Sequence, residues 1–136
     1  MVVKCINNIT FEFELLGIND DFGDPIISNY FNICGDKCVY SIEVNECYKV
    51  YAIAMINGKL HYLLLGSTGF PQFYKANLFQ IIENDIFELN FVSYFENEFI
   101  SYLISNEYLS NVEIIKKIIR KDSVELLNFY KYTKNE

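Results

Sequence analysis

Residues 48–65 read YKVYAIAMINGKLHYLLL, in which two apolar runs flank the pair Asn57-Gly58. Asn-Gly is favoured in two-residue type I′ turns, because both central residues of such a turn need a positive φ. The stretch therefore predicts a β-hairpin. Counting outward from the turn pairs Ile56 with Lys59, Met55 with Leu60, Ala54 with His61 and Ile53 with Tyr62.

Side chains alternate between the two faces of a strand, so the same stretch also predicts which residues share a face. We expect the core to receive Tyr51, Ile53, Met55, Leu60, Tyr62 and Leu64. The opposite, less apolar face holds Ala52, Ala54, Ile56, Lys59, His61 and Leu63. His61 is the single histidine, and we expect a solvated or hydrogen-bonded strand residue at this position, not a catalytic base.

Period-two alternation predicts further strands in the first two thirds of the chain. They fall at residues 11–15, 30–34, 38–44, 79–82 and 85–94, while segment 99–103 fits either a strand or a helix. Segments 30–34 and 38–44 are expected to form a second hairpin. A helical turn is expected between the turn at 66–71 and the strand at 79–82.

The C-terminal third changes to a helical period. Ser110 and Glu113 fit a capping box, in which both side chains satisfy free backbone N–H groups at a helix start. An apolar stripe follows at Val112, Ile115, Ile118 and Ile119, with Lys116, Lys117, Arg120 and Lys121 on a solvated face. We expect this helix to end at Asp122, which caps a second helix carrying Val124, Leu127 and Tyr130.

Together these segments predict one α+β domain over residues 1–136. Its expected form is a curved, hairpin-rich antiparallel sheet of five to seven strands with α-helices at the C-terminal end. Residues 1–98 are expected to be mainly β and residues 99–136 mainly helical. A chain of 136 residues with 51% hydrophobic residues is long enough to bury a core.

Charge is distributed unevenly along the chain. Residues 1–98 hold 13 acidic side chains and 5 Lys and Arg, a net charge of −8, whereas residues 99–136 hold 5 acidic and 6 basic ones, a net of +1. Such a body repels nucleic acid and anionic membranes and attracts basic proteins. The N-terminus lacks a signal-peptide pattern, and no apolar run approaches the ~20 residues that span a bilayer, so we expect a cytoplasmic protein.

The four cysteines are Cys5, Cys34, Cys38 and Cys47. Without an export signal we expect reduced thiols and no metal site. A three-residue loop between Cys34 and Cys38 would place these two thiols opposite each other across a hairpin, so a redox or metal role for this pair stays open as the alternative.

No pattern that marks a catalytic site occurs in the sequence. There is no nucleophile elbow, zinc-protease motif, phosphate loop or dinucleotide fingerprint. Glu12 and Glu14 share a strand face, as the two carboxylates of a glycosidase can. The alternation of a half-buried strand places them there without any catalytic role. We therefore predict no catalytic residue, no cofactor and no small-molecule substrate; the chain is expected not to be an enzyme.

The densest acidic loops are expected to bind a protein partner. The predicted partner-binding residues are Asp20, Asp21, Phe22, Asp24, Tyr30 and Asp36, which combine carboxylates with flanking aromatic rings. Three classes of function stay open: an inhibitor that neutralises a basic protein, a peptide-binding adaptor or regulatory domain, and an enzyme whose site carries no recognisable motif. Acidity, size and abundant Tyr and Phe favour the inhibitor.

A longer run adds a resemblance. The segments YLLL (62–65), GFPQFY (69–74) and LFQIIEN (78–84) lie within about a sixth of the chain. Together with the acidic, Asn- and Ile-rich character, they resemble the small intracellular immunity proteins that protect bacteria against toxins of contact-dependent inhibition and related polymorphic systems. The resemblance implies an antitoxin that binds a cognate toxin domain tightly. Such a domain is often a nuclease, whose active site or adjacent surface the immunity protein blocks.

Overall fold

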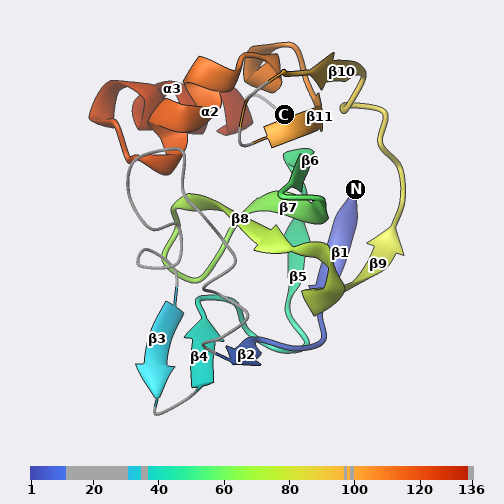
Figure 1. Ribbon diagram of the computed structural model, residues 1–136, viewed down its shortest axis with the longest axis vertical. Coiled ribbons are helices and arrows are strands. Elements are labelled where there is room, and N and C mark those ends of the chain that lie inside the picture. Colours follow the sequence, from blue (N-terminus) through green and yellow to red (C-terminus); the bar gives the residue numbers. More distant parts are fainter. Residues whose placement is uncertain (12–30, 35–36, 97, 99, 135–136) are drawn as a thin grey trace.

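The computed structural model of this chain describes residues 1–11, 31–34, 37–96, 98 and 100–134 (Figure 1). Its strands are β1 (Val2–Cys5), β2 (Ile9–Phe11), β3 (Phe31–Cys34), β4 (Lys37–Tyr40), β5 (Cys47–Lys49), β6 (Ala52–Ile56), β7 (Lys59–Leu65), β8 (Pro71–Lys75), β9 (Phe79–Glu83), β10 (Phe91–Tyr94) and β11 (Ile100–Ser105). Its helices are η2 (Ala76–Leu78), η3 (Tyr108–Ser110), α2 (Val112–Ile119) and α3 (Ser123–Lys134). Antiparallel strands followed by C-terminal α-helices confirm the predicted α+β class.

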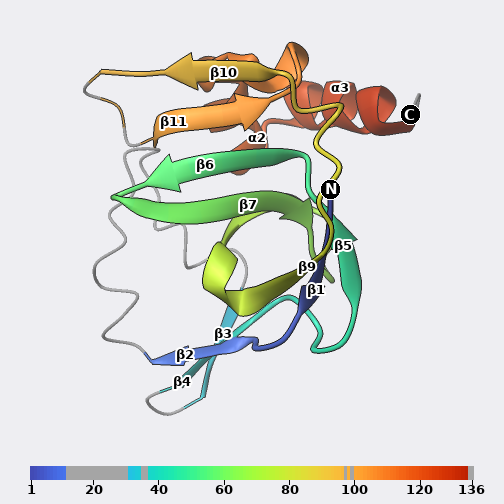
Figure 2. The ribbon, with the colours of Figure 1, turned by 90° about the vertical axis from the view of Figure 1, so that its right-hand side faces the viewer.

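The strands of the described residues form three antiparallel sheets (Figure 2). The central sheet has five strands in the order β10-β11-β6-β7-β8. Two sheets of three strands, β5-β1-β9 and β2-β4-β3, accompany it. We expected one sheet of five to seven strands, and the central sheet has five. The other strands of the described residues form the two smaller sheets.

The hairpin of β6 and β7 has the predicted turn and register. Ile56 lies opposite Lys59, and the pairing continues outward to Ala52 and Leu63. Asn57 has φ 50° and Gly58 has φ 74°, the positive values that a type I′ turn requires. The predicted turn and register are therefore confirmed. They could be predicted because a two-residue turn fixes the pairing of the strands on either side of it.

Two layers cover the central sheet unequally. Figures 1 and 2 place α2 and α3 against one face, where Ile115, Ile118 and Phe129 are fully buried. The sheet β5-β1-β9 covers part of the other face, because the ring of Phe79 in β9 packs on Tyr62 at 5.9 Å and on Tyr74 at 6.4 Å between ring centroids. Those two tyrosines belong to β7 and β8. Among the described residues, no such layer covers the part of this face formed by β6, β11 and β10, where Tyr94 and Tyr102 are exposed.

The prediction of which hairpin face enters the core was only partly right: Tyr62 and Leu64 are buried as predicted. Ala52, Ala54 and Ile56, expected on the less buried face, are all buried, whereas Leu60 is 42% exposed. His61 is also buried, so the solvated alternative is wrong; its Nδ1 lies 2.8 Å from the Lys59 carbonyl oxygen, as the hydrogen-bonded alternative expected. Alternation separates two faces but does not say which one the helices will cover.

Elsewhere the strands differ in part from those predicted. Residues 71–75, expected to lie in a turn and helical segment, form β8, whereas η2 and β9 follow as predicted. Only residues 91–94 of the segment 85–94 are a strand, since 85–90 form a turn region in which Phe87 is 84% exposed. The undecided segment 99–103 contributes to the strand β11. Of the predicted strand 11–15, residues 12–15 lie outside the described residues.

The predicted hairpin at 30–44 exists, but its second strand ends at Tyr40. In its register Cys34 lies opposite Lys37, and Cys38 lies opposite Ile33. The expectation that the two cysteines face each other across the hairpin is therefore wrong at the level of backbone pairing. Cys5 and Cys47 are free thiols, the first buried and the second exposed.

The two helices begin and end close to the predicted residues, with two corrections. Asn111, not Ser110, caps α2, because the Asn111 side chain accepts the hydrogen bond from the Glu113 N–H at 2.9 Å. Asp122 caps α3 as predicted, with its Oδ1 accepting from the Glu125 N–H at 2.9 Å. The buried stripe of α3 is Glu125, Leu126 and Phe129, whereas Val124 and Leu127 are exposed.

Candidate protein-interaction surface

The six residues predicted to bind a partner all lie outside the described residues. These are Asp20, Asp21, Phe22, Asp24, Tyr30 and Asp36. Their role stays a prediction, and the structure brings none of them into a described site. A candidate surface comes instead from the uncovered part of the central sheet.

Large apolar side chains occupy this uncovered part, which we call the open face. It consists of Ile53, Met55, Leu60, Val92, Tyr94, Tyr102 and Ile104. Val92 is 73% exposed, Tyr94 60% and Tyr102 53%. The rings of Tyr94 and Tyr102 contact each other, with centroids 5.2 Å apart.

Strand register explains why these residues share one face. Val92 lies opposite Ile104 and Tyr94 opposite Tyr102 across the β10–β11 pair. Since directly opposed residues of antiparallel strands project to the same side, the set continues through β6 to Leu60 in β7. The alternate residues on β11 and β6, such as Leu103 and Ala54, project to the helix side and are buried.

A second group of exposed apolar residues lies on the same side of the molecule. In Figure 2 the connection from β9 to β10 rises on this side, past the right-hand ends of β6 and β11. Its exposed apolar side chains, with those at the end of β9, are Ile81, Ile82, Ile86 and Phe87. Phe87 is held in its turn by the Asp85 carboxylate, which accepts a hydrogen bond from the Phe87 N–H at 2.9 Å.

The chain around this surface carries a negative charge. Residues 76–115 contain seven carboxylates and no Lys, Arg or His. They are Glu83, Asp85, Glu88, Glu96, Glu98, Glu107 and Glu113. Three of them contact a lysine: Glu88 lies 3.2 Å from Lys49, and Glu98 and Glu113 lie 3.0 Å and 3.6 Å from Lys116. Among the described residues, the other four carboxylates have no basic side chain within 4 Å.

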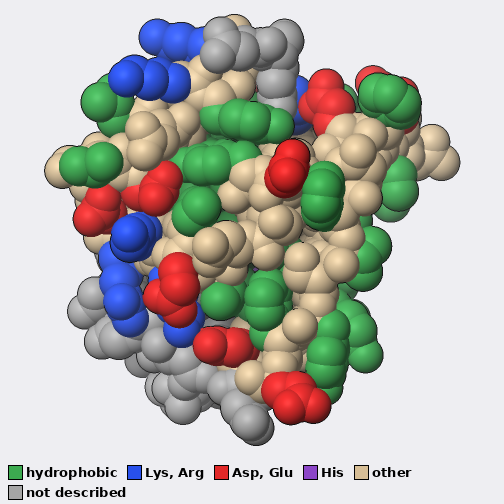
Figure 3. Space-filling view, turned by 90° about the horizontal axis from the view of Figure 1, so that it is seen from above, with side chains coloured by type: hydrophobic (Ala, Val, Ile, Leu, Met, Phe, Trp, Pro, Cys, Tyr) green, Lys and Arg blue, Asp and Glu red, His purple; other side chains and the backbone are tan. Residues whose placement is uncertain are grey.

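A space-filling view shows how charge and apolar surface combine. In Figure 3 exposed apolar side chains follow the right-hand edge, on the side away from α2 and α3, and carboxylates lie among them. The sequence signal that marks this surface is the forty-residue interval without a basic residue. Its position could have been found by counting charges in a sliding window, whereas the exposure of the apolar residues could not.

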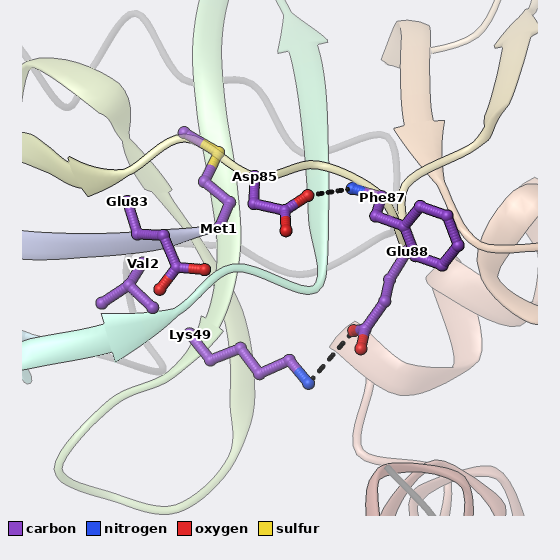
Figure 4. A pocket seen from close by; sticks show the side chains of 7 residues that line it. All are labelled: Met1, Val2, Lys49, Glu83, Asp85, Phe87 and Glu88. Carbon is purple, nitrogen blue, oxygen red and sulfur yellow. Dashed lines mark hydrogen bonds and ion pairs between the residues drawn. The ribbon is translucent and has the colours of Figure 1, made fainter.

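A small hollow adjoins the connection from β9 to β10 (Figure 4). Its volume is about 260 Å³, and its walls are Met1, Val2, Lys49, Glu83, Asp85, Phe87 and Glu88. Three of these side chains are carboxylates, and the ion pair between Lys49 and Glu88 crosses one wall. The hollow therefore continues the acidic and apolar character of the surface beside it.

Burial shifts the pKa of several titratable groups outside this surface. Burial lowers the pKa of His61 to about 4, with the charges of Lys75 and Lys59 lowering it further and the bond to the Lys59 carbonyl opposing them. Burial also raises the pKa of the Cys5 thiol. Tyr108 donates to Glu125 at 2.7 Å, and its pKa is raised by burial and by that carboxylate.

Across the described ranges no three His, Cys, Asp or Glu side chains come together as a metal site. The helices of the described residues are too short or too polar to cross a bilayer. Comparisons with protein-family models, with curated proteins and with solved structures found no match to this chain.

Proposed function

We propose that this chain is a non-enzymatic inhibitor that binds and neutralises a basic protein, as an immunity protein does with its cognate toxin domain. The observation that carries the proposal is the open face, an apolar sheet surface within an acidic part of the chain. The resemblance to immunity proteins points to the same kind of partner. A nuclease domain fits because its substrate-binding cleft must be basic.

The composition of the open face suits a protein interface. Interfaces are enriched in Tyr, Phe and Met and depleted of charge at their centre, with polar residues around the rim. The open face has Tyr102 and Met55 on the inner strands β11 and β6, and Val92 and Tyr94 on the edge strand β10. Exposed apolar patches of this kind usually mark a binding surface in soluble proteins.

The acidic residues supply selectivity for a basic partner. Complementary charge steers two proteins together and suppresses partners of like charge. Glu83, Asp85 and Glu96 are exposed and lie at the ends of β9 and β10, on either side of the apolar residues in the chain. A partner whose apolar contact is bordered by Lys and Arg would satisfy both features of the surface.

We predict that a gene beside the one for this chain encodes the toxin domain. The test is co-expression of the chain with that domain, followed by titration of the two purified proteins. We expect the chain to restore growth and to form a one-to-one complex. Tyr102→Lys places a positive charge at the centre of the open face and should weaken binding by about tenfold or more.

Leu127→Lys is the matched control, because Leu127 is 55% exposed and lies on α3, on the other side of the sheet. It should leave the affinity unchanged. A chain that neither binds nor protects against the toxin domain contradicts the proposed function. A chain that protects, but binds equally well with either lysine substitution, contradicts the open face as the site.

A further inference from the structure

The outer edge of β10 offers free backbone groups beside the open face. β10 ends the central sheet, and among the described residues β11 is its one hydrogen-bonded neighbour. Exposed strand edges of this kind are templates for another strand, and natural proteins usually protect them. In β10, by contrast, Phe91, Val92 and Tyr94 are each at least 40% exposed.

The pairing pattern shows which backbone groups point outward. The Phe95 N–H donates to the Ser101 carbonyl at 3.0 Å, so residue 95 belongs to a hydrogen-bonded pair with β11. Such pairs alternate along antiparallel strands, which turns the N–H and C=O groups of Phe91 and Ser93 toward β11. The corresponding groups of Val92 and Tyr94 therefore point toward the free edge.

The same two residues place their side chains on the open face. A strand added at this edge would extend the central sheet to six strands and set every second side chain beside Val92 and Tyr94. Backbone hydrogen bonds would supply affinity, and the row of side chains on the open face would supply specificity, as in other cases of strand addition.

Charge argues against a second copy of this chain as the added strand. Pairing of two β10 strands would bring together two copies of the acidic interval at residues 76–115, which contains seven carboxylates and no basic residue. Like charges that face each other across a sheet are destabilising. A strand with Lys or Arg at both ends avoids this repulsion and gains attraction from the same carboxylates.

We infer that β10 accepts an extended segment of the partner, with alternating apolar residues and basic residues at both ends, as an added strand of the central sheet. This inference rests on the proposed function, since it gives the mode in which the basic partner binds. It assigns recognition to the backbone of Val92 and Tyr94 in addition to the side chains of the open face.

The test uses the peptide KKVTVTVKK as a probe and follows backbone amides of the full chain by NMR. We expect peptide binding to slow hydrogen exchange at the Val92 and Tyr94 amides most strongly. The peptide EEVTVTVEE, which has the same strand pattern and the opposite charge, should not bind. Slowed exchange confined to another element, or no binding of the basic peptide, overturns the inference.

Val92→Pro removes the outward N–H at the centre of the edge. Proline is tolerated in an edge strand where its nitrogen faces solvent, so the fold should persist. We expect the affinity for the basic peptide to fall by about tenfold or more, as for a lost backbone hydrogen bond and a blocked edge. Val92→Ala keeps the N–H and should lower affinity by less than about threefold.

Tyr94→Pro repeats the measurement at the second outward amide, in case Val92→Pro disturbs the strand. Equal affinity of a folded proline variant and the parent chain overturns the inference. The proposed function is judged separately: a chain that protects against the toxin domain and binds it equally well with Val92→Pro keeps its function and loses the strand-addition mode.

Discussion

Gly58 occupies the one turn whose geometry was predicted residue by residue. Its φ is 74°, and a Cβ at this position would meet no atom within 4 Å. The cost of a side chain here is therefore conformational and not steric. Gly58→Val should lower the free energy of unfolding by about 1–2 kcal/mol, because a β-branched residue resists positive φ.

Gly58→Asn provides the control, since Asn adopts the left-handed region more readily. Urea denaturation of both variants checks the expectation, with Asn costing clearly less than Val. An equal loss for the two would mean that the side chain, and not the backbone angle, decides the stability of the turn.

Gln72 is a second residue whose side chain should affect the free energy of unfolding. Its side chain is fully buried in β8, and among the described residues neither Nε2 nor Oε1 has a hydrogen-bond partner. A buried amide without partners costs about 1–3 kcal/mol. Gln72→Met, which has a similar shape, should raise the free energy of unfolding by about that amount, and Gln72→Glu should lower it. A lower unfolding midpoint for the Met variant would contradict the assignment.

His61 should make stability depend on pH. In the folded chain its pKa is about 4, against 6.5 in the unfolded chain, so the unfolded state binds the proton first as the pH falls. The stability contributed by neutral, buried His61 is therefore complete above pH 6.5 and is lost progressively down to about pH 4. The loss should reach at most about 3 kcal/mol.

Urea denaturation at several pH values, with His61→Gln as the comparison, isolates this contribution from that of the carboxylates. The difference in unfolding free energy between parent and variant should change between pH 6.5 and pH 4 and be constant above that interval. A difference that is flat with pH would show that His61 titrates normally in the folded chain.

At the scale of elements, the start of α2 depends on a single side chain. Asn111 accepts the hydrogen bond from the Glu113 N–H, while the Ser110 hydroxyl donates to the Glu107 carbonyl at 2.6 Å. Asn111→Ala should cost about 0.5–2 kcal/mol of stability, as for other lost N-caps. Asn111→Asp should retain most of it, because a carboxylate also accepts at a helix start.

Thermal unfolding of Asn111→Ala and Ser110→Ala compares the two candidate caps directly. The sequence pattern predicted that the serine substitution costs more, and the structure reverses that order. A larger loss for Ser110→Ala would restore the predicted capping box and place the helix start one residue earlier.

At the scale of the whole molecule, the distribution of charge should govern association with a basic partner. Glu83→Gln together with Asp85→Asn removes two carboxylates beside the exposed apolar residues and keeps the oxygen that accepts from Phe87. Association with the toxin domain should slow by about tenfold at low ionic strength. The effect should largely disappear at about 1 M salt, where the Debye length is near 3 Å.

Glu43→Gln together with Glu46→Gln is the matched control, because it removes the same charge from the exposed turn before β5. Stopped-flow measurements should show a smaller change for this pair. Asp20, Asp21 and Asp24, changed together to Asn, test the predicted acidic loop in the same assay. If only that triple variant slows association, the predicted loop and not the surface beside the open face steers the partner.

Several features of this protein follow from the sequence by itself. The Asn57-Gly58 turn, the register of its hairpin and the end of α2 near Asp122 were predicted correctly. Each depends on the backbone conformation of a few adjacent residues, which their side chains restrict directly. The α+β class follows for the same reason, since it needs only the periods of the individual segments.

Only the tertiary structure decided which side of each element is buried. Met55 and Leu60 were predicted as core, and they belong to the open face because α2 and α3 cover the alanine side of the hairpin. Val92 and Tyr94 are exposed because β5-β1-β9 covers the sheet only over β7 and β8. Burial depends on contacts between segments far apart in the chain, and local periodicity carries no record of those contacts.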